Sequence, residues 1–519
     1  MRITLVYRGR YWVRQALDLE TLASVIRAAG HRVQLVYDPD TFGVSDNVLQ
    51  IPRLAGLLSS SRSVLRRIAA SRPDVLLFSV LPGSYAWSRT IARGCKDETD
   101  VPVVFMGLHP SLVPERIMRD GCVDYVIQGE TENVVCLLLE ALSAREEPRG
   151  VGNLWYRADG RVARPPQAEL VDLDALPLPD KDLFVPYVSH AFSYAAMVSR
   201  GCPYRCSFCE ETCSKKLYGG RYYRRKSVDS VMAELVAGKR KYRFREVIFK
   251  DSYLSGNKPW LADLMSRYRR EIGVPFKCFC TIDGFDSQTA RLLKEGGCYS
   301  VEFGLQTWNP TIRREVLHRG ETNEQALAAF GHCADQKLWY DVDHMFNLPR
   351  ETEQDHVDGA LQYRRLRYLN RVKVHHLVYL PNAEIVNHGL AAEALPPDVR
   401  ERLADGWESD FYSQAAGSDE QRASVAAYAA LYKLLPVLPD RLVHWLARRG
   451  RARYLRLLPS PVMAALQGLM ALRSGDLRFL AYLGLYPAKV FRAVIDRLSI
   501  PLWPGPRIKA PQTRIGVPG

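Results

Sequence analysis

The chain has 519 residues, which is long for one domain and suggests about three. Its eleven cysteines follow no regular spacing, which argues against the disulfide framework of a small secreted protein. The net charge is +14, but Asp440–Gly519 alone holds fourteen Arg and Lys against three Asp, so most of the excess belongs to the tail. No stretch is apolar over the roughly 18 residues of a membrane span, and the first residues do not form a secretory signal; we therefore expect a cytoplasmic protein.

Residues 1–145 are expected to form a doubly wound α/β domain. Apolar, strand-forming runs at 3–7, 32–37, 74–80, 101–106 and 125–130 alternate with helical spacing, as over Leu17–Gly30. Continuously apolar strands that alternate with helices predict a parallel sheet covered on both faces.

Small and polar residues gather where these strands end, which is where ligands bind in such a sheet. The candidate cofactor contacts are Ser79, Gly83, Gly107, His109, Gly129 and Glu130. The alternative is that glycine and proline only make tight turns here. The residues by themselves leave both interpretations open.

Residues 146–190 are rich in Pro and Asp, as in Arg164-Pro-Pro and Asp174–Asp180. Such a composition favours irregular structure. We expect a linker that packs along the domains on either side.

Six strand-like runs recur with helices between them over residues 191–385. They lie at 194–199, 246–250, 276–281, 299–305, 340–346 and 373–379. Six such units are too few to close an eight-stranded barrel, and in this architecture the chemistry lies at the carboxyl ends of the strands. Thr281, His375 and His376 lie near such ends, either as walls of a substrate cavity or as structural residues.

The first of these strands leads directly into three closely spaced cysteines. Cys202, Cys206 and Cys209 offer three thiolates, where a zinc ion or a closed iron-sulfur cluster would take four. Three ligands leave one iron of a [4Fe-4S] cluster open to a small molecule. Two alternatives stay open on the residues alone: a chance spacing, and a four-cysteine site that includes Cys213.

The Cys-x3-Cys-x2-Cys spacing, with Phe208 just before the third cysteine, resembles the signature of the radical S-adenosylmethionine (SAM) enzymes. The resemblance implies a partial (β/α)6 barrel, a [4Fe-4S] cluster held by Cys202, Cys206 and Cys209, and SAM bound to the open iron. It also implies that Phe208 packs near the adenine of SAM. Arg200 and Arg205 flank the cysteines, either to stabilise the thiolates or as ordinary surface groups.

The same resemblance places SAM contacts on later strands. Asp251 stands where many members carry a glutamate for the SAM amino group; the alternative is that it caps the helix beginning near Lys258. Glu302 and Gln306 face the same way along their strand, and Glu302 resembles the family's acidic residue that contacts the ribose or methionine part of SAM. A buried Glu302 needs a partner, which we expect to be a ligand or an arginine.

The fifth strand and its end resemble the Gly-x-Pro-x-Glu-Thr motif of this group. Phe346 is assigned to the cofactor site, and Asn347 stands where glycine is usual. The substitution leaves the backbone path near the adenine open.

Two segments of the first domain resemble the cobalamin-binding domain that many radical SAM enzymes carry. They are Gly107-Leu-His-Pro with the following Pro114-Glu, and Asp124-Tyr-Val-Ile-Gln-Gly-Glu-Thr-Glu132. The pairing covers the chain through about Leu390 and implies cobalamin as a further cofactor. The Asp-x-His-x-x-Gly loop that supplies a histidine to cobalt in other proteins is missing, so we expect base-off cobalamin without a histidine ligand. His109 is assigned to a turn or a pocket wall.

Residues 386–519 are expected to form a basic helical region. Apolar residues recur with helical spacing over 425–435, 444–458, 462–473 and 477–498, with arginine and aromatic residues between them. This pattern predicts a lid over the barrel mouth or, second, a surface for anionic lipid or an acidic substrate; a nucleic-acid surface is least favoured. A lipid contact would hold the protein peripherally at the inner membrane face.

The combined resemblance implies a cobalamin-dependent radical SAM enzyme. The first expectation is a methyltransferase that acts on an unactivated carbon through a 5'-deoxyadenosyl radical and methylcobalamin. The alternatives are an oxidative cyclase or rearrangement enzyme of the same family and a non-catalytic cobalamin or iron-sulfur sensor. The expected partners are a small-molecule or lipid-like substrate and an electron donor such as flavodoxin or ferredoxin.

Overall fold

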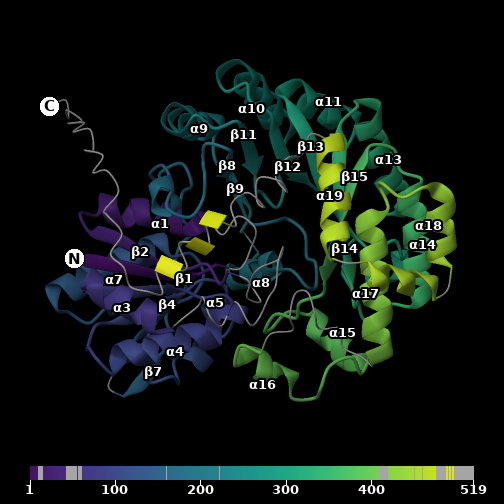
Figure 1. The fold of residues 1–519 in the computed structure, drawn as a ribbon. Coiled ribbons are helices and arrows are strands. Elements are labelled where there is room, and N and C mark those ends of the chain that lie inside the picture. The colour runs from purple at the N-terminus through teal and green to yellow at the C-terminus, as the bar shows by residue number, and fades with distance from the viewer. Residues whose placement is uncertain are drawn as a thin grey trace.

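The computed structural model describes residues 1–9, 16–41, 61–158, 160–220, 222–407, 419–448, 450–458 and 460–474, together with positions 55, 487–488, 490–491 and 494–495. Figure 1 shows an amino-terminal α/β domain beside a larger, partly closed barrel, with the last helices on the far side of the barrel. The amino-terminal sheet is complete before the barrel begins at Ser193.

The amino-terminal sheet has, within the described residues, five parallel strands in the order β2-β1-β3-β4-β5. Their bounds are β1 Arg2–Arg8, β2 Arg32–Asp38, β3 Val75–Ser79, β4 Val103–Met106 and β5 Tyr125–Ile127. All residues of β3 and β4 are buried, because helices cover both faces of the sheet. The doubly wound fold expected from the sequence is confirmed.

Two pairs of helices make these faces. Helices α1 (Leu17–Ala28) and α7 (Glu132–Ala144) pack on one face, and α3 (Ser61–Ser71) and α4 (Tyr85–Lys96) pack on the other. Short helical turns follow the strand ends: η1 (Pro82–Ser84) after β3, then α5 (Leu108–Leu112) and α6 (Pro114–Ile117) after β4. In this strand order, ligands bind outside the carboxyl ends, where the chain reverses between β1 and β3.

The segment expected as a linker contains two strands. Strands β6 (Leu154–Ala158) and β7 (Arg161–Ala163) form an antiparallel hairpin that extends the first sheet beyond β5. Leu154 and Trp155 are buried there, so the hairpin belongs to the packing of the amino-terminal domain. The later part, with η2 (Lys181–Phe184), is irregular and runs between the domains.

The second sheet is a six-stranded parallel sheet, by the residues described, in which neighbours along the chain are neighbours in space. The strands are β8 Ser193–Ala196, β11 Glu246–Phe249, β12 Phe276–Cys280, β13 Cys298–Gln306, β14 Trp339–Phe346 and β15 Leu369–His376. The sheet is open between β8 and β15, as in a partial (β/α)6 barrel. Strand β15 begins four residues before the expected Lys373, because buried Leu369 and Asn370 continue its pairing with β14.

Helices cover the outer face of this sheet. They are α9 Val228–Tyr242, α10 Lys258–Glu271, α11 Ser287–Gly296, α13 Asn323–Asp335 and α14 Glu353–Arg364, with the short α12 Pro310–Glu315 after β13. Their apolar sides and the outward faces of the strands form one large hydrophobic core. The inward faces are left for polar and charged residues.

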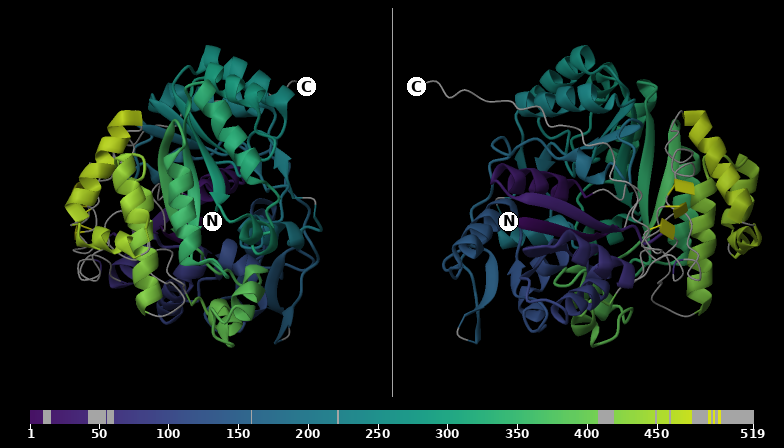
Figure 2. Two further views of the ribbon diagram at one scale, coloured as in Figure 1. Left: turned by 90° about the vertical axis from the view of Figure 1, so that its right-hand side faces the viewer. Right: turned by 60° about the vertical axis from the view of Figure 1, so that its left-hand side comes forward.

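The carboxyl-terminal helices pack against the edge of the barrel. Helices α17 (Asp419–Leu434) and α19 (Ser460–Ser474) lie along β15, and α18 (Asp440–Ala447) lies on α14 (Figure 2). These helices therefore shield the edge of the sheet. Residues 475–519 of the region expected to form a lid lie almost wholly outside the described residues. The shorter α15 (Ile385–Ala391) and α16 (Val399–Ala404) lie on the side that meets the amino-terminal domain.

One expected helix of the tail differs from the structure, and another cannot be compared with it. The segment 444–458 is divided, because α18 ends at Ala447 and Gly450 has a φ of 73° before η3 (Arg451–Leu457) begins. The segment 477–498 lies almost wholly outside the described residues. Within the described ranges, no helix is long and apolar enough to cross a bilayer.

Candidate active site between the domains

A cavity of about 670 Å³ lies between the two domains. Each domain contributes residues from the carboxyl ends of its parallel strands. The amino-terminal side includes Tyr7, Asp18, Ser79, Pro82 and Leu108, and the barrel side includes Met197, Ser199, Phe208, Cys209, Lys250, Met345 and His376. Both sheets therefore direct their ligand-binding edges at the same space.

The three cysteines lie between β9 (Ser199–Arg200) and α8 (Glu210–Leu217). Cys206 is buried, Cys209 lines the cavity, and all three are free thiols. Burial raises the pKa of Cys202 to about 11 and that of Cys209 well above its usual value, and the nearby Cys206 sulfur adds to both shifts. The three sulfurs are therefore neighbours, and their thiolate forms need positive charge close by.

Arg319 supplies such a charge, and no motif in the sequence pointed to it. Its Nη1 lies 3.6 Å from the Sγ of Cys206, Nη2 donates to the Gly304 carbonyl at 2.7 Å, and Nε donates to Glu321 at 2.6 Å. Burial raises the pKa of Cys206, and Arg319 lowers it. Because 113 residues separate Arg319 from Cys206, no motif spacing connects them.

The other charged and sulfur groups near the loop are placed differently. Arg205 is exposed, and Arg200 donates to Glu132 of the amino-terminal domain at 2.5 Å. Cys213 packs against an apolar cluster that includes Val316. Its pKa is raised by burial, with smaller charge effects from Lys216 and Glu210.

Asp251 is buried just after β11. One of its carboxylate oxygens is hydrogen-bonded, and the other has no partner among the described residues. Oδ1 accepts from the backbone N–H groups of Val198 and Ser199 at 2.9 and 2.6 Å and from the Ser199 hydroxyl at 2.6 Å. Oδ2 has no hydrogen-bond partner among the described residues, and burial raises the pKa of Asp251 to about 6. The helix-cap alternative does not hold, since Asn257 caps α10. A buried, half-satisfied carboxylate is suited to a cationic ligand.

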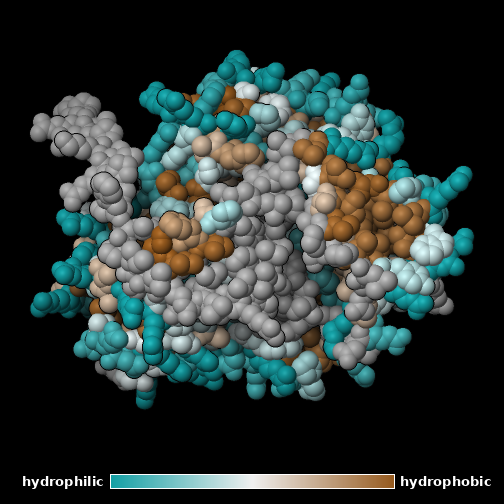
Figure 3. Space-filling view, viewed as in Figure 1, coloured by the Kyte–Doolittle hydropathy of each residue, from teal (hydrophilic) through white to brown (hydrophobic). Residues whose placement is uncertain are grey.

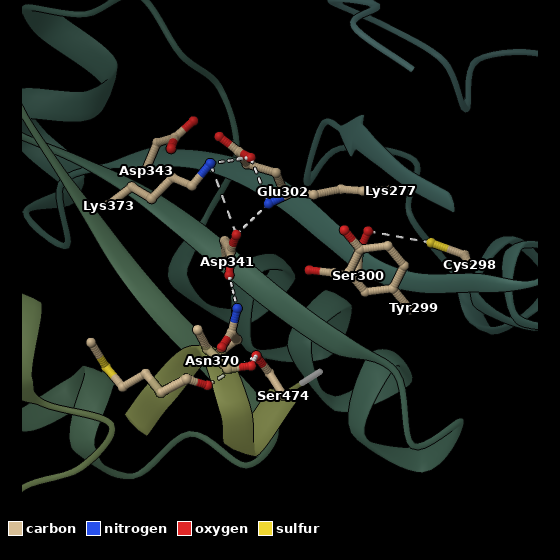
Figure 4. Close-up of polar contacts among 12 residues, drawn as sticks. Lys277, Cys298, Tyr299, Ser300, Glu302, Asp341, Asp343, Asn370, Lys373 and Ser474 are labelled. Atoms are coloured by element: carbon tan, nitrogen blue, oxygen red, sulfur yellow. Dashed lines mark hydrogen bonds and ion pairs between the residues drawn. The ribbon is translucent and has the colours of Figure 1, made fainter. Parts of the chain in front are cut away.

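Glu302 is buried inside the barrel, where lysines balance its charge instead of the expected ligand or arginine (Figure 4). Lys277 Nζ lies 2.9 Å from Glu302 and also pairs with Asp341, while Lys373 pairs with Glu302 from across the barrel. Asp341 accepts from Asn370 at 2.7 Å. Burial raises the pKa of Glu302, but the two lysines hold it well below its usual value. Inward-facing positions of different strands converge here, which strand-by-strand inspection could not reveal.

Asp343 and His375 lie one inward-facing position closer to the barrel mouth than Asp341 and Lys373. Their side chains are 3.2 Å apart, and burial together with Glu302 raises the pKa of Asp343. The barrel interior is therefore polar from its floor to its mouth.

Of the other candidate wall residues, only His376 lies on the cavity among the described residues. It bonds Asn347 through its Nδ1 at 2.9 Å. Thr281 donates to the Asp283 carbonyl at 3.1 Å, which is a local turn contact.

The ends of β13 and β14 bring together some predicted residues and separate others. Gln306 is buried with a φ of 70°, and its Oε1 has no partner among the described residues. Phe346 points into the main core against Tyr432, whereas Met345 lines the cavity, because successive side chains of a strand face opposite ways. Asn347 has a φ of 66°, the left-handed conformation that glycine adopts freely, so it keeps the backbone path of the glycine it replaces.

The ends of β3 and β4 in the amino-terminal domain reach the cavity. Ser79 lines it, and Gly83 belongs to η1 beside the wall residue Pro82. Gly107 has a φ of 100°, and a Cβ there would lie 3.2 Å from the backbone of Val80. The turn at Gly107 thus delivers Leu108 to the wall.

The remaining candidates of this domain face other elements. His109 is fully buried; its ring lies 4.5 Å from that of Tyr85, and its Nε2 is 3.2 Å from the Ala404 carbonyl. Burial lowers the pKa of His109 to about 4. Gly129 and Glu130 meet the cysteine-bearing segment of the barrel and lie away from the cavity.

The donor set suits an iron-sulfur cluster better than a single ion. Over the described residues, no group of three or more His, Cys, Asp or Glu is placed to hold a metal ion. In a four-iron cluster each thiolate binds a different iron, so the sulfurs stand farther apart than around one ion. Three neighbouring thiols with Arg319 beside them fit a cluster that keeps one iron open.

The cavity wall on the amino-terminal side fits a flat cofactor. It is formed by the ends of β1, β3 and β4, with Tyr7, Leu81, Pro82 and Leu108 as apolar surfaces. This is the binding edge of a doubly wound sheet. His109 is already engaged elsewhere, so this wall would hold cobalamin without a histidine ligand from that position.

Comparison with known families agrees with the two halves of this site. Residues 197–360 match the radical SAM superfamily, and residues 14–139 match the B12 binding domain. The first range contains the three cysteines, Asp251, Glu302 and Arg319, and the second contains the ends of β3 and β4 that face the cavity.

Several known proteins resemble the chain over both halves. An uncharacterized methyltransferase of Pyrococcus horikoshii is 28% identical over 348 residues, which are 66% of this chain and 74% of that protein. The anaerobic magnesium-protoporphyrin IX monomethyl ester cyclase of Rubrivivax gelatinosus is 21% identical over 64% of this chain and 59% of its own length. The solved structure of TsrM from Kitasatospora setae, a radical SAM methyltransferase with cobalamin and a [4Fe-4S] cluster bound, has a TM-score of 0.63 at 16% identity and covers 90% of this chain and 99% of that one. The last comparison shows a shared fold. The two matched domains mean that the chain belongs to the radical SAM superfamily, among the enzymes that carry an amino-terminal B12-binding domain.

Proposed function

We propose that this enzyme is a cobalamin-dependent radical SAM methyltransferase that methylates an unactivated carbon of a small molecule. The observation that carries the proposal is the single cavity walled on one side by strand ends of the B12-binding domain and on the other by Cys209 and the barrel mouth. A substrate carbon in that space is within reach of both cofactors, which is the proximity that two-cofactor chemistry needs. The methyltransferase among the relatives supports the same reaction class.

In this proposal the chain's own residues bind and orient. Cys202, Cys206 and Cys209 hold the cluster, and Arg319 supports the Cys206 thiolate. The unpaired Oδ2 of Asp251 accepts the ammonium group of SAM. When bound, the cluster and SAM supply a 5'-deoxyadenosyl radical, and cobalamin supplies the methyl group. All other binding and orientation is done by protein side chains.

The cavity walls offer mainly apolar surface to this chemistry. Tyr7, Leu81, Leu108 and Met345 present apolar surface around the space, and a radical in a dry site is protected from side reactions. The polar barrel interior with Asp343 and His375 favours a substrate that inserts a hydrogen-bonding part into the barrel.

Labelled SAM tests the function. The anaerobically reconstituted protein is incubated with cobalamin, a one-electron reductant, SAM with a deuterated methyl group and a metabolite extract of the source cells. We expect a product heavier than its precursor by one labelled methyl group replacing hydrogen, absent with Cys206→Ala. A product without the label, formed together with 5'-deoxyadenosine, would instead support a cyclase or rearrangement enzyme. One of the relatives is named as a cyclase.

Two partners complete the proposal. The cluster needs an external one-electron donor of the flavodoxin or ferredoxin type.

The second partner is an anionic membrane surface at the tail. Leu469 and Leu472 on α19 are 56% and 60% exposed, and Figure 3 shows an apolar area where α17 and α19 lie. Arg451 stacks on the half-exposed Trp445, with 5.2 Å from the guanidinium carbon to the ring centre.

A further inference from the structure

The loop between β5 and α7 of the B12-binding domain, together with the first residue of α7 (residues 128–132), contacts the amino-terminal end of the cysteine-bearing segment. Arg200, two residues before Cys202, donates to Glu132 at 2.5 Å and lies 3.4 Å from Glu130. Arg224, which pairs with Arg200 across β9 and β10 (Arg224–Arg225), also binds Glu130 and donates to the Val171 carbonyl at 2.8 Å. The loop therefore contacts the chain both before and after the cysteines.

The same loop holds the far end of helix α8, which begins directly after Cys209. The Tyr218 hydroxyl accepts from the Glu130 N–H at 2.7 Å and from the Asn153 side chain at 3.2 Å. A Cβ at Gly129 would lie 2.2 Å from that hydroxyl, and Gly129 has a φ of 84°. Glycine is required at 129 by this close approach of α8, which gives the glycine a role other than cofactor contact.

These contacts are ion pairs whose side chains are largely buried. The side chains of Glu130 and Glu132 are 8% and 3% exposed, and that of Arg200 is 18% exposed. Removing one partner of such a pair leaves an uncompensated charge. Arg200 and Arg224 are also direct cross-strand neighbours, so without Glu130 between them two like charges would oppose each other.

We propose that Glu130 and Glu132 are positioning residues through which the B12-binding domain sets the place of the cluster-binding segment, residues 200–224. They act through Arg200 and Arg224 at one end and, by the Glu130 backbone, through Tyr218 at the other. The inference rests on the proposed function only in that Cys202, Cys206 and Cys209 hold the cluster. Within the barrel, Arg319 ties Cys206 to β13, while the opposite side of the segment is tied to the other domain. The distance between cluster and cobalamin is then fixed by this interface.

The test compares full-length Glu130→Gln, Glu132→Gln and Tyr218→Phe with wild type by hydrogen exchange and by cluster spectroscopy. Arg116→Gln is the matched control, because Arg116 pairs with Asp405 across the same two domains without touching residues 200–224. We expect exchange in 200–224 to be about tenfold faster in the variants, in both the cluster-free and the reconstituted protein, and unchanged in the control. The change that SAM causes in the electron paramagnetic resonance spectrum of the reduced cluster should be smaller and broader in the variants.

A double variant separates positioning from general loosening. Arg200→Gln with Glu132→Gln should perturb the spectrum no more than Arg200→Gln alone, because Glu132 acts through Arg200. Additive effects, or exchange and spectra like wild type in all three single variants, would overturn the inference. Tyr218→Phe leaves every charge in place and keeps the test valid if a glutamine variant folds poorly. Failure of the proposed function would look different: wild type itself would hold no cluster, while the exchange comparison would still report on the loop.

Discussion

The guanidinium of Arg319 lies with Nη1 3.6 Å from the Sγ of Cys206, the buried cysteine of the trio. Because Nη2 is bonded to the Gly304 carbonyl of β13, Arg319 joins the cysteine loop to the barrel sheet as well as supplying charge. Arg319 therefore contributes in two ways, by its charge and by its geometry, that can be tested separately.

Replacing Arg319 by Met should weaken cluster binding. The reconstituted variant should hold less iron and lose its cluster several-fold faster than wild type, since a buried thiolate loses its partner. Arg319→Lys keeps the charge without the two-pronged geometry and should fall between the two. Iron content and visible absorbance over time measure this. Arg314→Met, at a largely exposed position near the same loop, is the control, and equal decay in both Met variants would contradict the role.

Single alanine variants of the four clustered cysteines should divide into two groups. Cys202→Ala, Cys206→Ala and Cys209→Ala should each abolish the cluster, whereas Cys213→Ala should keep it, since Cys213 packs against an apolar cluster and three thiolates suffice for an open iron. Iron analysis and spectroscopy of the reduced proteins distinguish the groups. Loss of the cluster in the Cys213 variant would favour a four-cysteine site and argue against an open iron.

Asp251 should give SAM binding a pH dependence. Its pKa is about 6 in the folded protein, and only the carboxylate form binds an ammonium group, so SAM affinity should increase as the pH rises through about 6. Asp251→Asn should bind SAM weakly and without this dependence. Equilibrium binding of SAM to the reconstituted proteins across this range checks it, and a flat wild-type profile would exclude Asp251 as the amino partner.

The same group links stability to pH in the opposite sense. Since the pKa of Asp251 in the folded protein lies above the ordinary value of 3.8, Asp251 contributes stability that is fully present below that ordinary pKa and is lost as the pH rises through about 6. Relative to wild type without SAM, Asp251→Asn should therefore gain stability as the pH rises. Thermal unfolding of both proteins at several pH values measures the trend. The same pH dependence of stability in both proteins would mean that Asp251 does not titrate near pH 6.

Lys277→Met should destabilise the barrel more than Lys373→Met. Lys277 is fully buried between Glu302 and Asp341, so its removal leaves two carboxylates without their shared cation and should cost about 3–5 kcal/mol. Lys373 is 27% exposed and should cost less. Denaturant unfolding of the two variants gives the comparison, and equal losses would show that solvent reaches the barrel floor.

The tail should bind anionic vesicles if the exposed face of α19 meets lipid. Leu469→Ser with Leu472→Ser should reduce sedimentation with phosphatidylglycerol vesicles several-fold, and added salt should weaken the wild-type binding. Leu137→Ser, at a similarly exposed position on α7, is the matched control. The same sedimentation with neutral and anionic vesicles would rule out the contact.

Much of the architecture was predictable because it depends on local patterns. Runs such as residues 74–80 and 299–305 are apolar enough to require a sheet buried on both faces, and β3 and β13 form there. The cysteine spacing indicated a cluster loop, since its ligands lie within a single turn of chain. The linker was less well predicted, because the hairpin of β6 and β7 gains its stability from pairing with β5, a contact that local composition does not encode.

The contacts among distant residues were decided by the tertiary structure. Lys277, Glu302 and Lys373 come from three strands and meet only because the sheet curves into a barrel, and Arg319 reaches Cys206 from a later loop. Phe346 and Met345 differ by one position, yet the strand's alternation turns one into the core and the other to the cavity. The sequence by itself determined which chemistry the chain carries, because ligand spacing and strand patterns are local. Which charges balance one another, and how one domain holds the other's cluster loop, depended on how the two sheets pack.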